Sequence, residues 1–149
     1  MSSKKKIEKS KAVYQYIHCD VYKHGVVIFI GDCTSLREWV KKVYKDAQSE
    51  ELVNDIEKNC TEEEYFREDI SARCYFSESG HFIVHLPKFS FEYNPSEISN
   101  LSHELLHATF LILDFIGMEY RYQGNNEAYT YLLEFLLKNA LVKKNYKKV

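Results

Sequence analysis

The stretch NPSEISNLSHELLHATFLILDFIG, residues 94–117, decides how this chain folds. Asn94 at the N-cap, Pro95 at the first helical position and Glu97 two residues later predict the start of a helix. Gly117 predicts its end, because glycine readily takes the left-handed conformation that follows many helices. Apolar residues cover nearly every face between these signals, which is typical of a central, buried helix.

This apolar helix carries the polar segment HELLH at residues 103–107. Side chains four residues apart share one face of a helix, so His103 and His107 can present two imidazoles to one metal ion. In an HExxH arrangement the glutamate, here Glu104, takes a proton from a metal-activated water instead of binding the metal. Two interpretations are open: a zinc site, or core histidines that are satisfied by neighbouring carboxylates.

A catalytic zinc ion usually has three protein ligands and one open position, so a third ligand is needed. Glu127, 20 residues after His107, is the preferred candidate, because the intervening loop is long enough to reverse the chain. Asp114 lies about 10 Å further along the helix than His107 and cannot reach the same ion. Glu119 and Glu134 are weaker candidates, since one belongs to the helix-end turn and the other lies about two turns beyond Glu127.

HELLH followed by Asn126-Glu127-Ala128 resembles the gluzincin branch of the zincin metallopeptidases. Residues 94–138 are also similar to small metallopeptidase-like proteins of tailed bacteriophages. The resemblance implies Zn²⁺ as the metal, with His103, His107 and Glu127 as its ligands and Glu104 as the general base. It further implies a peptide or protein substrate, which pairs with an edge strand at Phe82 to Leu86.

The rest of the chain predicts a single α+β domain over residues 1–149. Strands are expected at Ala12 to Ile17, Val26 to Ile30, Ala72 to Phe76 and Phe82 to Leu86, and helices from Ser35 to Ala47, within residues 49–68, and from Asn126 to Val142. The expected arrangement is a short antiparallel sheet packed on the central HELLH helix, with the C-terminal helix carrying Glu127. The lysine-rich residues 1–10 and 143–149 are expected to be flexible tails.

Composition excludes several partner classes. The formal charge of −2 predicts no nucleic-acid binding, and no apolar run approaches the roughly 20 residues that cross a bilayer. The four cysteines, Cys19, Cys33, Cys60 and Cys74, form no CxxC pair and are expected to be buried free thiols. Without an apolar leader the chain is expected in the cytoplasm, or in the host cytoplasm if it is phage-encoded.

Three functions are compatible with these features. The preferred one is a zinc metallopeptidase that hydrolyses a peptide bond by a metal-activated water. The alternatives are a catalytically silent, zinc-stabilised binding or regulatory module, and a tail or assembly component whose metal is structural. No oxyanion-stabilising side chain can be selected among the candidates Tyr120, Tyr122, Tyr129, Tyr131, His81 and His85.

Overall fold

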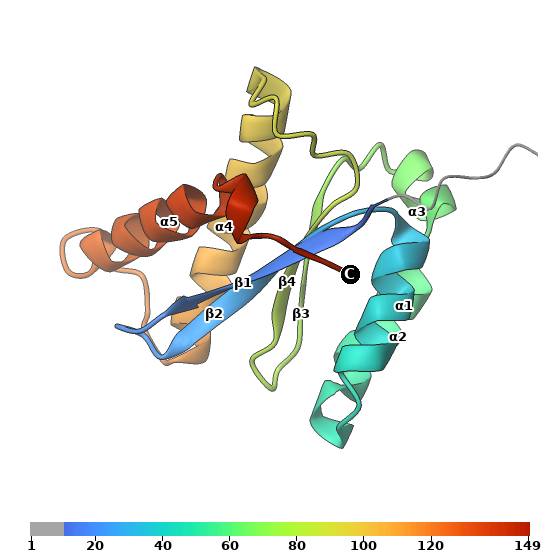
Figure 1. Ribbon diagram of the computed structural model, residues 1–149. Helices are drawn as coiled ribbons and strands as arrows, with labels where there is room; N and C mark the ends of the chain where they lie inside the picture. The colour runs from blue at the N-terminus through green and yellow to red at the C-terminus, as the bar shows by residue number, and fades with distance from the viewer. Residues whose placement is uncertain (1–10) are drawn as a thin grey trace, which may run out of the picture.

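The computed structural model describes residues 11–149, so the predicted tail at residues 1–10 lies outside it (Figure 1). The strands are β1 (Val13–Cys19), β2 (His24–Ile30), β3 (Arg73–Phe76), β4 (Phe82–Leu86) and β5 (Lys147–Lys148). The helices are α1 (Cys33–Val43), α2 (Glu50–Asn59), α3 (Glu62–Arg67), α4 (Pro95–Phe115) and α5 (Asn126–Ala140), with short 3₁₀ turns at Ala47–Ser49 and Lys143–Asn145. The predicted α+β class is confirmed.

The five strands form one mixed sheet in the order β3-β4-β2-β1-β5. The prediction of an antiparallel sheet is wrong at one pair, because β2 and β4 run parallel. Parallel strands need a long crossover connection, and here α1, α2 and α3 supply it between β2 and the β3–β4 hairpin.

The prediction that Phe82 to Leu86 lies at an edge of the sheet is also wrong. This strand, β4, pairs with β2 on one side and with β3 on the other, and all five of its residues are buried. A continuous apolar run is typical of an interior strand. The edge on this side of the sheet is therefore β3.

Helices cover both faces of the sheet, with α4 and α5 on one face and α1 and α2 on the other (Figure 1). Successive side chains of β4 point to opposite faces of the sheet, so this strand contributes to the hydrophobic cores on both faces. Phe82, Val84 and Leu86 belong to the core beneath α4, whereas Ile83 belongs to the core beneath α1. His85 faces the α1 side as well, since its ring contacts Phe29.

The predicted limits of α4 are confirmed. The Asn94 side chain accepts a hydrogen bond from the Glu97 N–H, and Pro95 is the first helical residue. Gly117 follows the helix with a φ of 83°, and its N–H donates to the Asp114 carbonyl. Among residues 11–149, none of the helices combines the length and the apolar character needed to cross a bilayer.

Residues 143–149, which were predicted to be a flexible tail, form a 3₁₀ turn and the short strand β5. β5 pairs with β1, and the Val149 N–H donates to the Ala12 carbonyl. Tyr146 holds the segment in place, because its hydroxyl donates to the Ala140 carbonyl and its ring packs edge-on against Phe91. Apolar and hydrogen-bonding contacts at one tyrosine thus fix a lysine-rich segment on the sheet.

Candidate functional site

His103 and His107 lie one helical turn apart on the exposed surface of α4. Their Nε2 atoms face each other at 3.1 Å. Two imidazole nitrogens bound to one tetrahedral zinc ion at about 2.0–2.1 Å would be about 3.3 Å apart. The distance between the two nitrogens is therefore compatible with a metal ion held between the side chains.

Glu104 is turned from the histidines towards the sheet, because the next residue on a helix points about 100° away. Its side chain is buried, and its carboxylate accepts a hydrogen bond from the backbone N–H of Cys74 in β3. Burial raises the pKa of Glu104, and the neighbouring His103 and His107 oppose that rise. A carboxylate with a raised pKa is well suited to accept a proton near neutral pH.

A groove of about 640 Å³ runs between α4 and the edge of the sheet at β3. Its floor and walls come from residues 69–74 and Phe76 on the sheet side, and from α4 on the other. The α4 side chains that line it include Asn100, His103, Glu104 and His107. Of the residues that the structure describes along this groove, Asp69 is the only acid besides Glu104.

Cys74 also lies in the groove but is not a nucleophile at neutral pH. Burial and the charge of the Glu104 carboxylate raise the pKa of its thiol to about 12. Because the thiolate is the reactive form of cysteine, this thiol stays protonated and inert. The chemistry of the groove is therefore left to its other polar residues, among them His103, Glu104 and His107 on α4 and Asp69 after α3.

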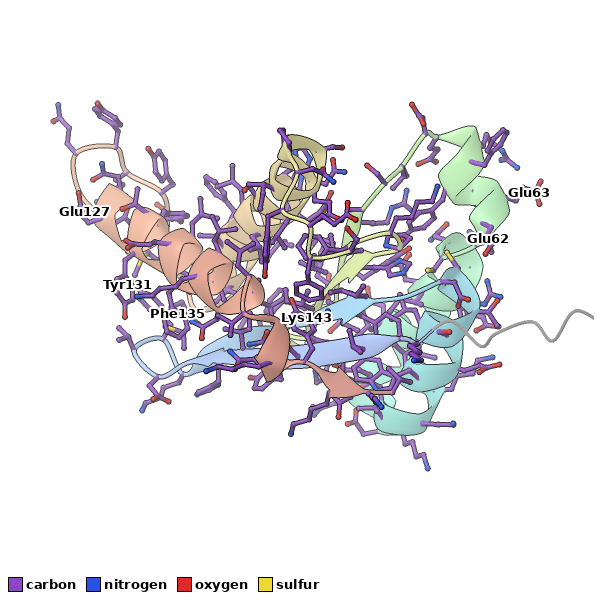
Figure 2. The ribbon with its side chains drawn as sticks, turned by 45° about the horizontal axis from the view of Figure 1, so that its top comes forward. Glu62, Glu63, Glu127, Tyr131, Phe135 and Lys143 are labelled. Carbon is purple, nitrogen blue, oxygen red and sulfur yellow. The ribbon has the colours of Figure 1, made fainter. Side chains whose placement is uncertain are left out.

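The structure does not bring Glu127 to the two histidines. Figure 2 shows Glu127 at the outer end of α5, on the same side of that helix as Tyr131 and Phe135. The ring of Tyr131 packs edge-on against Tyr22 in the β1–β2 turn. The opposite side of α5 packs on α4 through Tyr129, so helical periodicity carries Glu127 away from the groove.

The other candidates from the sequence are engaged in contacts outside the groove lining. Tyr120 and Tyr129 pack against Phe110 where α4 meets the start of α5. His81 lies 3.2 Å from the Ser49 hydroxyl, and His85 is buried on the opposite face of the sheet. None of the six proposed oxyanion partners lines the groove within the described part of the chain.

A second group of metal-binding side chains lies in the core beneath α1 and was missed by the sequence analysis. The ligand atoms of Cys33, Cys60 and His85 all lie within 4.8 Å of one another, and all three residues are buried. This thiol–imidazole cluster could hold a metal ion. Within residues 11–149 it is the only set of three His, Cys, Asp or Glu residues that converges so closely.

The prediction of free cysteines is confirmed, and three of the four are buried. Sequence spacing carried no signal for the cluster, since its members are the first residue of α1, the residue after α2 and the second-last residue of β4. The Cys33 thiol hydrogen-bonds to Cys60, and this contact together with His85 lowers the pKa of the Cys60 thiol.

Comparison with protein families, curated proteins and solved structures found no match to this chain.

Proposed function

We propose that this protein is a zinc-dependent hydrolase of peptide bonds, with His103 and His107 as zinc ligands and Glu104 as the general base. The observation that carries the proposal is the pair of facing Nε2 atoms, 3.1 Å apart, above a groove that also contains a buried glutamate. The gluzincin resemblance of HELLH supports the same assignment of roles to these three residues.

The contacts of Glu104 suit the role of a general base. The Cys74 N–H holds its carboxylate beside the groove, and burial favours the transfer of a proton onto it. Zinc, when bound, supplies the Lewis acidity that activates a water molecule and polarises the scissile carbonyl. Glu104 then takes a proton from the attacking water and passes it to the leaving amine.

Asp69 is the candidate for the third ligand in place of Glu127. It lines the same groove as the histidines, and its backbone has a φ of 51° in the loop after α3. Carboxylate oxygen is an ordinary zinc donor, and three protein ligands leave the open position that hydrolysis requires.

The exposed edge of β3 is the proposed binding site for the peptide. The Ser77 N–H donates to the His81 carbonyl, so these two residues form a hydrogen-bonded pair. Hydrogen-bonded and non-hydrogen-bonded pairs alternate along antiparallel strands, so the backbone N–H and C=O groups of Cys74 and Phe76 point away from β4. The Cys74 N–H is not free for a peptide, because it already donates to the Glu104 carboxylate. An extended peptide can therefore add to the sheet through the Cys74 carbonyl and both backbone groups of Phe76, as peptides do at other free sheet edges.

The decisive test compares Glu104→Gln with the unmutated chain, both loaded with zinc. Loss of the general base should slow cleavage of a random-sequence peptide library by about 10²–10⁴-fold, while zinc content stays the same. New termini are counted by mass spectrometry. Glu134→Gln is the matched control, because Glu134 is exposed on α5 and does not line the groove.

Equal cleavage by Glu104→Gln and the unmutated chain would contradict the assigned base. An unmutated chain that binds zinc through the histidines but cleaves no peptide would favour the second candidate, a zinc-stabilised binding module. Among residues 11–149, no third His, Cys, Asp or Glu ligand atom lies within 4.8 Å of both His103 and His107, so zinc held by this pair alone would lack the third protein ligand of a catalytic site.

A further inference from the structure

The thiol–imidazole cluster is assembled by three separate elements on the face of the sheet opposite the groove. Cys33 is the first residue of α1, Cys60 follows the last turn of α2, and His85 lies in β4. The exposed fraction is 3% for Cys33 and zero for Cys60 and His85. The three side chains therefore meet in a region that bulk water does not reach.

The hydrogen bonds of His85 orient its free nitrogen towards the sulfur atoms. Nε2 lies 2.7 Å from the Gly31 carbonyl, which can only accept a hydrogen bond, so Nε2 carries the proton. The lone pair of a neutral imidazole then resides on Nδ1, which lies 3.5 Å from the Cys60 sulfur. A ring N–H held by a backbone carbonyl is the usual partner arrangement of a metal-binding histidine.

The spacing within the cluster matches a zinc site. A tetrahedral ion with a sulfur ligand at about 2.3 Å and a nitrogen ligand at about 2.0–2.1 Å would separate these two atoms by about 3.6 Å. The distance between Cys60 Sγ and His85 Nδ1 is 3.5 Å, and the Cys33 thiol hydrogen-bonds to the Cys60 sulfur.

We propose that Cys33, Cys60 and His85 bind a second zinc ion, which has a structural role. Two thiolates and one imidazole are a donor set that zinc favours. This inference is independent of the proposed peptidase function, because it concerns other residues on the other face of the sheet.

Binding releases two protons, one from each thiol, and the ion with two thiolates and a neutral imidazole is then uncharged overall. The His85 lone pair, which now accepts from the Tyr65 hydroxyl at 2.7 Å, passes to the metal. Tyr65 keeps other acceptors, since the Tyr75 hydroxyl lies at 3.0 Å and the Cys60 sulfur at 3.9 Å. A neutral centre with satisfied neighbours fits a buried position.

The fourth ligand position adjoins the same two tyrosines. Tyr65 and Tyr75 are both buried, and their hydroxyl groups lie beside Cys60. No substrate reaches this position, so the ion links the start of α1 and the end of α2 to β4. Such a link stabilises the folded chain, because the ion binds the assembled ligands and not the unfolded polypeptide.

The experiment uses the full chain with the groove site removed by the double substitution His103→Ala/His107→Ala. The purified double variant should contain one zinc ion per chain by mass spectrometry of the metal content. X-ray absorption at the zinc edge should show sulfur at about 2.3 Å and nitrogen at about 2.0–2.1 Å. Because all three cluster residues are intact in this variant, the result does not depend on a change in the core.

Adding Cys60→Ser to the double variant should remove that zinc, whereas adding Cys19→Ser should retain it. Cys19 is the matched control, since its thiol is equally buried but belongs to the core beneath α4. The inference is overturned if the double variant holds no zinc after refolding with it, if its zinc has no sulfur ligand, or if Cys33 and Cys60 are recovered as a disulfide.

Discussion

The groove over α4 and the thiol–imidazole cluster lie on opposite faces of the same β3–β4 hairpin, and they differ in exposure. His103 and His107 are open to solvent above a groove, whereas no water reaches Cys60 or His85. An exposed pair of nitrogen ligands suits an ion that meets a substrate. A buried sulfur-rich set suits an ion that holds elements together.

The two sites can lie close together because successive side chains of the edge strand β3 point to opposite faces of the sheet. The Cys74 side chain packs against the core beneath α4, and Tyr75 belongs to the core beneath α1. Neighbouring residues of one short strand therefore contribute to separate sites, because successive side chains of a strand point to opposite faces. A change at one site should leave the other largely undisturbed.

The largest expected difference is in stability, between His85→Ala and His103→Ala. Loss of His85 leaves a cavity and removes hydrogen-bond partners of the Gly31 carbonyl and the Tyr65 hydroxyl, at a cost of about 3 kcal/mol. Loss of the exposed His103 should change the free energy of unfolding by less than about 0.5 kcal/mol. Urea denaturation with a chelator present measures both values; similar costs would show that burial does not distinguish the two sites.

The second-largest expected effect is on the affinity of the groove site for zinc, and it depends on the third ligand. Asp69→Ala should weaken zinc binding at His103 and His107 by at least roughly 10–100-fold, because even the loss of a group that only supports a ligand commonly has that effect. Glu127→Ala should leave the affinity unchanged, because Glu127 lies at the outer end of α5 (Figure 2). Zinc titration of both variants in a Cys60→Ser background isolates the groove site. Weaker binding in Glu127→Ala alone would restore the ligand set predicted from sequence.

The smallest expected effect is the pH dependence of stability that comes from Glu97, a buried glutamate in the first turn of α4. Burial opposes ionisation of Glu97, but hydrogen bonds from Ser90 and the Tyr93 N–H outweigh it and lower the pKa of Glu97. A lowered folded-state pKa contributes stability that is present above the unfolded value of about 4.3 and lost as pH falls through the folded one.

Glu97→Gln should therefore destabilise the chain at about pH 7 by on the order of 1 kcal/mol and much less at about pH 3. Urea midpoints at both values check this. An equal difference between variant and unmutated chain at the two pH values would show that the Glu97 charge has no part in holding the start of α4.

Much of the fold could be predicted from local signals. Asn94, Pro95 and Gly117 determine the limits of α4 through backbone hydrogen bonding and conformation within a few residues. The limits of β4 were also predicted, since a run of apolar residues ends there at Pro87. Its place in the sheet was not, because pairing partners depend on contacts between residues far apart in the chain.

In the candidate site, too, the part that depends on local spacing was predicted and the part that depends on long-range packing was not. Helical periodicity alone places His103 and His107 on one turn, and the structure brings their Nε2 atoms together. Glu127 was selected because its distance along the sequence suits a returning helix. The side of α5 that meets α4 is instead decided by the packing of Tyr129 and Leu132, which sequence distance does not describe.

The sequence by itself thus determined the HELLH helix, its ends and the pairing of its two histidines, because each depends on interactions within a turn or two of helix. Only the tertiary structure decided that β3 is the edge beside the groove and that Cys33, Cys60 and His85 meet. Those features depend on the long crossover through α1, α2 and α3, which brings β4 beside β2 and closes the second core around His85.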